Sequence, residues 1–361
     1  MANYNKRHIY LGGNTRAGFV GFYNQLTQID SCNLYILKGG PGTGKSTFIK
    51  KVISELDNTG YAMDIVHCSG DPDSLDGVIC PKAGVIVIDG TAPHALEPYC
   101  VGARDNIINL GEFWDSDKLR LYKDNIASMT FDKQVYYKRA YSYLSAAGQI
   151  YDDSNYIVHT SMEEEKVNQF TSELASEIFS GFQESSIHGK NYSFYATAIT
   201  PGGRRGDLAN LVSGHKTYSI KTFYGINVST ILENLRNRAL CFGFNTQSIY
   251  CGFDASVLEH LIIPELGAAV VTSNSYHAVD ATDSYYDYPI DNLLCGYSMY
   301  SAKEDLKYNN NRFDELIDRA IRALNRARVM HAEIEKIYYP AMDFHRLNMY
   351  CDSVIKQIVN Q

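Results

Sequence analysis

The feature of this sequence that most restricts its fold is an internal repeat. Displacing the chain against itself by 183 positions (220 − 37) aligns residues 37–47 with residues 220–230. The same displacement, without a gap, pairs identical residues: Cys68 with Cys251, Asp71 with Asp254, Leu75 with Leu258, Pro81 with Pro264, Gly84 with Gly267 and His94 with His277. Self-similarity at a constant displacement indicates a duplicated fold. We predict two tandem domains, residues 1–185 and 186–361, called here the first and second repeats.

The end of each repeat also matches its counterpart. There the displacement becomes 180 positions (319 − 139), so that Leu144 aligns with Leu324 and Met162 with Met342. Between residues 313 and 330 apolar residues recur every three or four positions, which is the spacing of an amphipathic helix. Residues 136–150 are the equivalent segment of the first repeat. Each repeat is therefore predicted to end in a helical segment.

The beginning of each repeat has the pattern of an α/β domain. Short apolar, β-branched runs at residues 34–37, 62–66 and 85–88 alternate with helical patterns. Near-continuous apolar strands separated by helices indicate a parallel sheet covered on both faces. No Pro- or Gly-rich linker separates the repeats, so we expect them to pack together. The predicted fold is two tandem parallel-sheet domains.

One motif in the first repeat points to phosphate chemistry. Residues 39–46 read GGPGTGKS, which fits the pattern G-x-x-x-x-G-K-[ST]. A predicted strand precedes the motif, and an amphipathic helix carrying Phe48, Ile49 and Val52 follows it. The residues assigned to nucleotide binding are Gly39, Gly40, Pro41, Gly42, Thr43, Gly44, Lys45, Ser46 and Thr47.

This arrangement is the one that a triphosphate requires. Glycines let successive backbone amides turn inward and form an anion-binding nest, and the helix that starts there adds its unpaired amides and positive dipole end. We expect Lys45 to contact the β- and γ-phosphates and the Ser46 hydroxyl to bind Mg²⁺. The predicted cofactors are therefore ATP and Mg²⁺, and the motif defines a P-loop NTPase-type domain.

The second half of such a site is an acid at the end of a nearby strand. Asp89 follows the apolar run 85–88, and we predict that it binds Mg²⁺. His94 lies shortly afterwards and is a candidate catalytic residue; a loop histidine packed in the interior is an equally weighted alternative. Asp71 and Asp73 are further candidate bases. Gly90 occupies the position next to Asp89 where a water-activating carboxylate often lies.

The second repeat lacks the groups that hold a triphosphate. Gly39 is replaced by Thr222, Gly44 by Asn227, Lys45 by Val228 and Asp89 by Thr272, although Gly225 and Ser229 are retained. Each lost charge-assisted contact costs about 1.5–3 kcal/mol, so we predict a degenerate second site. We also considered that Arg204 or Arg205 of the second repeat reaches the nucleotide of the first; a basic surface turn is the favoured interpretation.

The strings GGPGTGKST, VIVIDGTAPH and FYATAITPGG (residues 194–203) resemble a sparsely characterised family of bacterial tandem P-loop proteins. Its members are described as ATP-binding proteins, ATPases or nucleotide kinases, and the resemblance covers the whole chain. It implies that residues 39–47 bind ATP and that Asp89 is the metal-binding acid. Second copies in this family often keep a better phosphate loop, and Asn227 and Val228 depart from that pattern. The resemblance implies no particular substrate.

Composition narrows the functional classes further. The chain has 33 Lys and Arg against 41 Asp and Glu, a net charge of −8 at pH 7, so it lacks the overall basic field of a nucleic-acid-binding protein. The sequence has neither a signal-peptide pattern nor a run of about 20 apolar residues. The eight cysteines lack metal-binding spacing. We expect a cytoplasmic protein that does not enter the membrane.

These observations lead to one hypothesis and two alternatives. The hypothesis is a P-loop ATPase with one Mg·ATP site that couples hydrolysis to an unidentified process. The first alternative is a kinase that passes the γ-phosphoryl group to a small-molecule or nucleotide acceptor. The second is a non-enzymatic, nucleotide-dependent switch or scaffold whose protein partner binds the helical segments.

Overall fold

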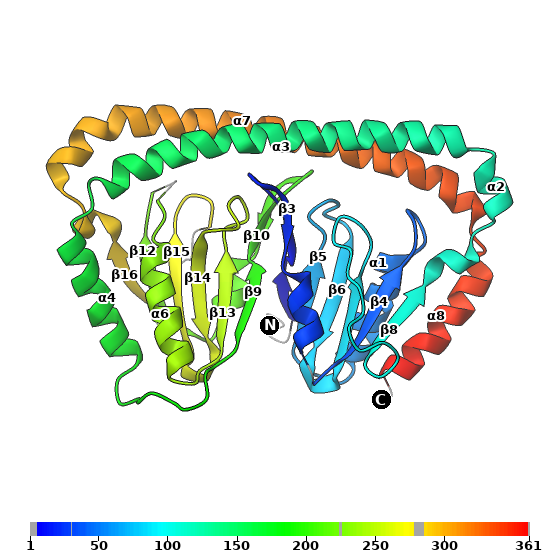
Figure 1. Cartoon of the computed structure of the whole chain (residues 1–361), viewed down its shortest axis with the longest axis horizontal. Helices are drawn as coiled ribbons and strands as arrows, with labels where there is room; N and C mark the ends of the chain where they lie inside the picture. The colour runs from blue at the N-terminus through cyan, green and yellow to red at the C-terminus, as the bar shows by residue number, and fades with distance from the viewer. Residues whose placement is uncertain (1–5, 30, 224–225, 278–284, 360–361) are drawn as a thin grey trace.

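The computed structural model describes residues 6–29, 31–223, 226–277 and 285–359. In these residues the chain forms two six-stranded sheets of the same connectivity, one from each repeat, and two long helices run across both sheets (Figure 1). The predicted duplication of an α/β fold is therefore confirmed.

Every strand of the first sheet has a counterpart in the second. The first sheet has the order β1 (Lys6–Ile9), β5 (Met63–His67), β6 (Leu75–Cys80), β7 (Val85–Asp89), β4 (Asn33–Lys38) and β8 (Asp105–Asn109). The second sheet has the matching order β9 (Asn191–Tyr195), β13 (Thr246–Tyr250), β14 (Leu258–Ile263), β15 (Ala268–Ser273), β12 (Lys216–Lys221) and β16 (Tyr285–Pro289). In both sheets the strand that leads to the predicted phosphate loop, β4 or β12, lies beside β7 or β15.

Both sheets are mixed, which corrects the prediction of purely parallel sheets. β6 runs antiparallel to β5 and β7, and β14 runs antiparallel to β13 and β15, whereas the other neighbouring strands are parallel. The reason is a short connection. Between β6 and β7 the chain makes one turn at Pro81–Ala83 and ends it at Gly84 with φ +67°. Only antiparallel neighbours can be joined so directly.

A β-bulge interrupts the same point of each sheet. His67 pairs with Leu75 and Val66 with Gly77, so Asp76 has no partner in the ladder. In the second sheet Tyr250 pairs with Leu258 and Ile249 with His260, which leaves Glu259 unpaired in the ladder. Bulges redirect side chains and are common beside functional sites.

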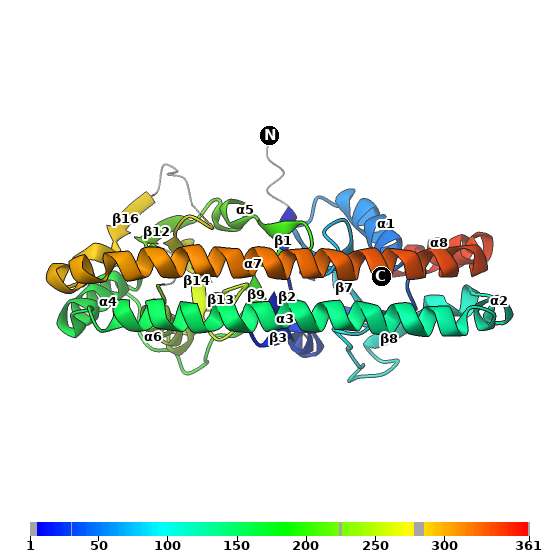
Figure 2. The same ribbon diagram turned by 90° about the horizontal axis from the view of Figure 1, so that it is seen from above.

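The two long helices, α3 (Lys123–His159) and α7 (Gly296–Tyr338), lie antiparallel and side by side over both sheets (Figure 2). They contain the helical segments predicted at residues 136–150 and 313–330. Small and aliphatic residues line their contact, including Ala140, Leu144, Ala320 and Leu324. The remaining helices, with 3₁₀-helices written η, are η1 (Tyr23–Gln28), α1 (Lys45–Asp57), η2 (Pro81–Ala83), η3 (Leu110–Phe113), α2 (Ser116–Arg120), α4 (Glu164–Ile178), α5 (Leu208–Val212), α6 (Ser229–Cys241), η4 (Pro264–Leu266), η5 (Ile290–Leu293), η6 (Tyr339–Ala341) and α8 (Phe344–Val359).

The repeats exchange their terminal helices. α4 is the last helix of the first repeat, yet its Phe170 and Leu174 pack in the core of the second sheet with α6. In the same way α8 is the last helix of the second repeat, yet Leu347 and Ile355 pack in the core of the first sheet with α1. α3 and α7 carry the chain from one sheet to the other (Figure 1). Each sheet is therefore covered on one side by a helix from the other repeat.

The two sheets also meet directly, as the absence of a linker predicted. Tyr10 and Tyr195 exchange backbone hydrogen bonds of 3.0 and 2.9 Å, which link the ends of β1 and β9. One hydrophobic core contains Ile9 and Ile36 of the first repeat together with Phe194 and Ile262 of the second. Two hairpins, β2 (Gly12–Thr15) with β3 (Gly18–Gly21) and β10 (Thr197–Thr200) with β11 (Gly203–Gly206), lie near this junction (Figure 1).

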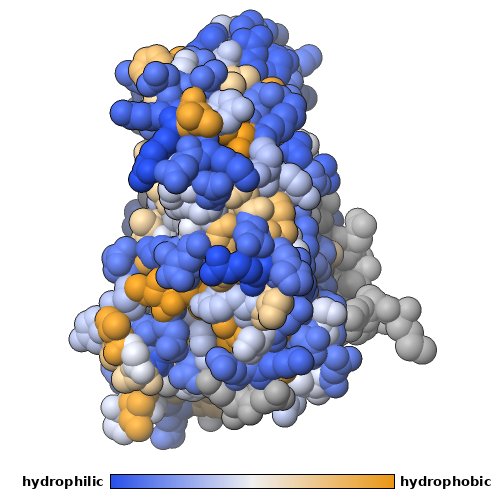
Figure 3. Space-filling model, turned by 90° about the vertical axis from the view of Figure 1, so that its right-hand side faces the viewer, coloured by the Kyte–Doolittle hydropathy of each residue, from blue (hydrophilic) through white to orange (hydrophobic). Residues whose placement is uncertain are grey.

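The surface carries apolar side chains in separate places. Figure 3 views the end of the molecule that carries the first sheet and α8, where mainly hydrophilic residues are interrupted by several apolar spots. Leu121 and Met349 are among the exposed apolar residues of the chain. None of the helices in the described part of the chain combines the length and the apolar character needed to span a lipid bilayer.

Candidate functional site

The predicted phosphate loop, residues 39–44, connects β4 to α1 in the first repeat. Gly39, Gly42 and Gly44 have positive φ angles of 155°, 70° and 83°, which residues with a Cβ adopt only with strain. Gly44 is the N-cap of α1, and the helix begins at Lys45. The loop therefore ends at a helix N-terminus, where free amides and the helix dipole favour an anion.

Short contacts keep this loop compact. The Thr43 hydroxyl donates a hydrogen bond to the Gly40 carbonyl (2.9 Å). A Cβ on Gly39 would lie 2.6 Å from Thr43 Oγ1, and one on Gly40 would lie 3.2 Å from the Trp114 ring. Glycine is therefore required by space as well as by backbone angle at Gly39. Of the other assigned residues, Pro41 is half-buried and Thr47 is exposed.

Lys45 and Asp89 come together beside the loop. Asp89 ends β7, and the strand register sets it opposite Leu37 of β4. Lys45 Nζ lies 3.8 Å from Asp89 Oδ2, and both side chains are mostly buried. The same ammonium donates hydrogen bonds to the carbonyls of Gly39 (3.1 Å) and Gly40 (3.0 Å). The lysine thus folds back over the loop that it follows.

The two predicted metal-binding residues also accept hydrogen bonds from the protein. The Ser46 hydroxyl accepts a hydrogen bond from the Leu75 amide (3.0 Å). Asp89 Oδ1 accepts hydrogen bonds from the Thr91 amide (2.9 Å) and hydroxyl (2.7 Å). Those contacts occupy one carboxylate oxygen and leave Oδ2 on the side of Lys45.

His94 is buried and is oriented by the backbone. Its Nδ1 donates a hydrogen bond to the Asp89 carbonyl (2.9 Å), because a carbonyl can only accept. Nε2 then faces Asp76 Oδ1 at 3.6 Å, and the ring stacks on Tyr23 with 5.0 Å between centroids. The structure therefore brings His94 to the end of β7, with its side chain directed toward a second carboxylate.

That second carboxylate, Asp76, was missed from the sequence. It lies on the β-bulge, and Tyr23 donates a hydrogen bond to its Oδ2 (2.9 Å). Burial raises the pKa of Asp76, and the nearby charge of Asp89 raises it further, while His94 opposes the shift. The displacement of 183 residues aligns Asp76 with Glu259 (259 − 76). One is an aspartate and the other a glutamate, so an alignment that looks only for identical residues does not find this pair.

Side chains of α3 and α7 bring positive charge close to the loop. Lys133 Nζ lies 3.5 Å from His331 Nδ1. Burial, together with the charges of Lys133 and Lys45, lowers the pKa of His331 to about 4. Burial also lowers the pKa of Lys133. The His331 shift shows that two lysine ammonium groups, those of Lys133 and Lys45, act on this ring.

An acid on α7 contacts the loop directly. The Glu335 carboxyl lies next to the Gly42 amide, and this amide and the charge of Lys45 both lower its pKa. Burial raises the pKa of Glu335 against these two effects. A loop amide predicted to bind phosphate therefore interacts with a carboxyl group from the other repeat.

Asp71 and Asp73, considered as bases, bind an arginine of the second repeat. Arg328 on α7 lies 2.8 Å from Asp71 Oδ1 and 2.6 Å from Asp73 Oδ2. The equivalent acid of the second repeat, Asp254, lies 3.2 Å from Arg16 of the first repeat. Each repeat thus receives an arginine from the other.

The hypothesis that Arg204 reaches the first repeat is wrong. Arg204 lies 3.0 Å from Asp314 of α7 and stacks 3.7 Å from the centre of the Tyr276 ring. Arg205, considered with it, lines a cavity of the second repeat. The sequence could not show that Arg328, rather than the hairpin arginines, lies across the boundary, because the exchange of helices is a tertiary feature.

The equivalent loop of the second repeat is held differently. α6 begins at Ser229 after Val228, which takes the position of Lys45. The Asn227 amide donates a hydrogen bond to Asn155 Oδ1 on α3 (2.8 Å), and the Asn227 side chain accepts one from the Ser229 amide (2.8 Å). Gly225, which the sequence alignment retains, lies outside the described residues.

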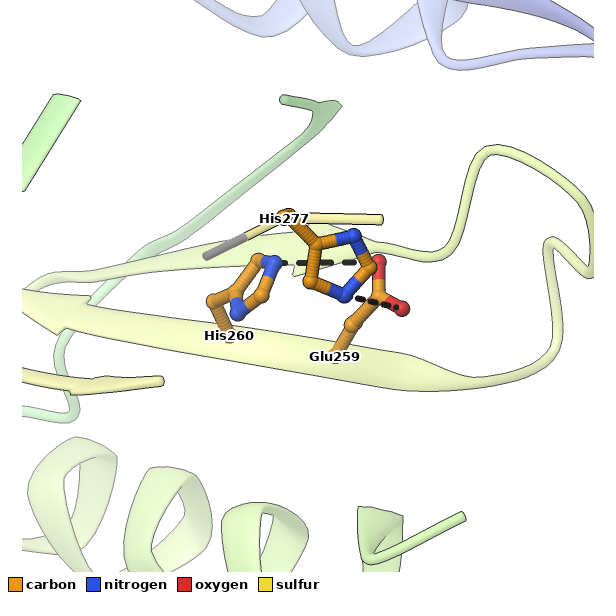
Figure 4. A group of neighbouring side chains, drawn as sticks. All are labelled: Glu259, His260 and His277. Carbon is orange, nitrogen blue, oxygen red and sulfur yellow. Dashed lines mark ion pairs between the residues drawn. The ribbon is translucent and has the colours of Figure 1, made fainter. Parts of the chain in front are cut away.

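The second repeat nevertheless keeps the paired carboxylate and histidine. Glu259 lies on the bulge of β14, and His277 Nε2 approaches its Oε1 at 3.0 Å. Figure 4 shows an ion pair from each of His277 and His260 to this carboxylate, and the distance from His260 Nε2 to Oε2 is 3.6 Å. Glu259 and His277 line a cavity of about 350 Å³.

Comparisons of the chain with protein-family models, with curated proteins and with solved structures give no match. The functional argument therefore rests on the geometry of the two repeats.

Proposed function

We propose that the protein binds Mg·ATP at residues 39–47 of the first repeat and hydrolyses it. One observation carries this proposal. Three glycines with positive φ form a loop that leads into α1 at Lys45, and the lysine lies 3.8 Å from a carboxylate at the end of the neighbouring strand. A phosphate nest, a mobile point charge and a metal-binding acid are the parts that P-loop NTPases combine.

The residues present fit these ligands. A Cβ at Gly39 would collide with Thr43, so the loop depends on glycine where its amides are to approach phosphate. The Ser46 hydroxyl and Asp89 Oδ2 would hold Mg²⁺, a cation that prefers oxygen ligands. When bound, the metal neutralises charge on the phosphates. Lys45 would exchange its contacts with the Gly39 and Gly40 carbonyls for phosphate oxygens.

Charge near the loop supports an anionic ligand. The pKa of His331 is lowered to about 4 by burial and by the charges of Lys133 and Lys45. Two ammonium groups, those of Lys133 and Lys45, therefore act at this point, and an anion bound near them would gain from both charges. A polyphosphate on the loop would be such an anion.

The same criteria disfavour a nucleotide on the second loop. Val228 supplies no charge, and the Asn227 amide is already bound by Asn155. Thr272 replaces the acid, and its hydroxyl donates a hydrogen bond to the Glu259 carbonyl (3.1 Å). We therefore assign one Mg·ATP site to the chain.

A second candidate function is a nucleotide-dependent switch. The contact between Glu335 and the Gly42 amide favours it, because a phosphate on this loop would compete with a helix that reaches the second repeat. A kinase with a small acceptor remains the third candidate. Product analysis separates them: an ATPase releases phosphate, a kinase forms a phosphorylated acceptor, and a switch binds ATP without either product.

The test compares Lys45→Ala with Lys51→Ala by thermal stabilisation in Mg·ATP. Both lysines lie on α1, but Lys51 pairs with Asp352 at the surface. Ligand at 100 times its dissociation constant stabilises a protein by about 2.7 kcal/mol. We expect this shift in the unmodified protein and in Lys51→Ala, and its loss in Lys45→Ala.

Phosphate release and labelled products are then measured on the unmodified protein, with and without cell extract. Stabilisation that persists fully in Lys45→Ala would refute the assignment of the site. Stabilisation without any phosphate release or labelled product would select the switch over both enzymatic functions.

A further inference from the structure

The cavity of the second repeat has the size and position of a ligand site. Its volume of about 350 Å³ lies within the range of small-molecule pockets. It is bounded by the hairpin β10–β11, the segments after β13 and β15, the start of β14, and the helices α3 and α7. This is the edge of the sheet where the parallel strands end, the usual place for ligands in α/β proteins.

Aromatic side chains form its walls. Tyr151 of α3 packs edge-on against Phe253 with 5.5 Å between ring centroids, and Phe253 packs against Phe313 of α7 at 4.9 Å. All three residues are at least nine-tenths buried. Rigid aromatic walls favour a planar aromatic ligand, because rings stack and meet edge to face at little entropic cost.

The inner end presents an ionised carboxylate. Burial alone would raise the pKa of Glu259, but the charge and hydrogen bond of His277, with contributions from His260 and the Cys251 thiol, lower it to about 2. Each carboxylate oxygen offers two lone pairs, so Glu259 can still accept N–H donors from a ligand. Burial and the neighbouring acids raise the pKa of Cys251 well above its ordinary value, so this thiol is not a nucleophile.

Hydrogen bonding argues against a metal between Glu259, His260 and His277 (Figure 4). The Thr272 amide donates a hydrogen bond to His260 Nδ1 (3.2 Å), so this nitrogen carries no proton. In the neutral ring the proton is then on Nε2, which faces Glu259 Oε2 at 3.6 Å. A protonated nitrogen cannot bind a metal. The cluster is better described as a carboxylate held between two imidazoles.

The outer end carries an exposed cation, Arg205, but lacks the lysine of a polyphosphate site. Arg205 is exposed there, whereas Arg204 is paired with Asp314. Asp207, the acid at the same end, accepts a hydrogen bond from the Asn210 amide at the start of α5. The adjacent loop carries Val228 in place of the lysine. A ligand with one phosphate fits this end better than one with two or three.

We propose that this cavity binds a purine nucleoside or its monophosphate. The base lies among Tyr151, Phe253 and Phe313 and donates its N–H groups to Glu259, and a 5′-phosphate lies at Arg205. This second site is independent of the Mg·ATP site proposed for the first repeat.

The test is isothermal titration of the full chain carrying Lys45→Ala, without Mg²⁺, so that the loop of the first repeat contributes no binding. The ligands are adenosine, guanosine, AMP, GMP and uridine. We expect one site that takes at least one purine nucleoside or its monophosphate, with weaker binding of uridine. Adding Glu259→Gln weakens binding at least about tenfold, because a charged acceptor is lost. Arg205→Ala weakens only the monophosphates.

The control is Glu265→Gln, the same substitution at an exposed glutamate outside the cavity lining, which leaves binding unchanged. Thermal melts check that each variant folds. The proposal is overturned if the Lys45→Ala protein binds none of the purine ligands, if Glu259→Gln binds them as tightly, or if binding occurs only when Lys45 is present. The last result would place these ligands on the first loop instead.

Discussion

Equivalent positions on the two long helices carry side chains of different character. At the displacement of 180 that relates α3 to α7, Lys133 of the first repeat corresponds to Phe313 (313 − 133) and His331 corresponds to Tyr151 (331 − 151). The first pair lies beside the glycine loop and the second pair lines the cavity. One duplicated fold thus provides a charged site and an aromatic site.

The helices contact the two loops in a corresponding way. Glu335 and Asn155 are equivalent by the same displacement, and each side chain lies next to a loop amide: Glu335 next to that of Gly42, and Asn155 within 2.8 Å of that of Asn227. In the second repeat the uncharged side-chain amide of Asn155 holds the loop at Asn227. The contact with a carboxyl group gives the first loop a partner that a phosphate would displace. The two repeats therefore share the position of the helix beside the loop and differ in the charge of the residue there, Glu335 or Asn155.

The largest expected effect concerns Gly77, which aligns with His260. A Cβ on Gly77 would lie 2.4 Å from Ile88 Cδ1 and 2.6 Å from the Val87 carbonyl oxygen, whereas the second repeat accommodates an imidazole at this point. We expect Gly77→Ala to lower the free energy of unfolding by about 3 kcal/mol, because backbone atoms cannot move aside. Urea denaturation measures the change.

Gly296→Ala is the matched control, since a Cβ there meets nothing within 4 Å. It should leave the free energy of unfolding nearly unchanged. Equal stability of Gly77→Ala and the unmodified protein would show that the repeats do not differ at the bulge as described.

The next effect is the pH dependence of stability, which should differ between the acids on the two bulges, Glu259 and Asp76. The pKa of Glu259 is lowered to about 2 from 4.5, so its charge stabilises the fold above about pH 4.5, and this contribution is lost as the pH falls toward 2. Glu259→Gln should therefore cost about 1–3 kcal/mol at pH 7 and progressively less below pH 4.5.

Ionisation of Asp76 has the opposite effect on the stability of the fold. Its pKa is raised from 3.8, so its ionisation opposes folding, and the penalty grows as the pH rises through the raised value. Relative to the unmodified protein, Asp76→Asn should become more favourable with rising pH. Unfolding free energies between pH 3 and 8 test both variants, and parallel curves for the two would contradict the difference.

The smallest effect concerns nucleotide affinity and depends on the proposed Mg·ATP site. Glu335→Gln removes a negative charge next to the Gly42 amide, so we expect Mg·ATP to bind about three to ten times more tightly, a change of roughly 1 kcal/mol. Asn155→Ala, the equivalent change at the second loop, should leave the affinity unchanged. Dissociation constants from titration calorimetry decide the matter, and weaker binding to Glu335→Gln would show that Glu335 assists the nucleotide.

Much of the fold follows from local sequence. The constant displacement predicts the duplication, and the apolar runs at 34–37, 62–66 and 85–88 lie within or overlap β4, β5 and β7. β6 was not among the predicted strands, although Pro81 and Gly84 mark a turn short enough for a hairpin before β7. The exchange of α4 and α8 could not be predicted, because an amphipathic pattern shows that a face is buried but not which sheet buries it.

The candidate site divides in the same way. Predicted strands and a predicted helix lie directly beside the glycine loop, Lys45, Ser46 and Asp89 in the sequence, so these residues could be found. The structure brings Lys45 and Asp89 together. Glu335 was not found, because it is distant in sequence and reaches the loop only through α7. Asp76 and Glu259 were missed because their positions depend on bulges, which leave no period in the sequence.

The exchange of α8 has a consequence during synthesis. A ribosome releases the strands of the first sheet well before it reaches Leu347 and Ile355, whose side chains complete that sheet's core. Domains usually fold in the order in which they emerge. Here the earlier half stays uncovered on one side until translation has passed the entire later half, so its nascent apolar surface is exposed for longest.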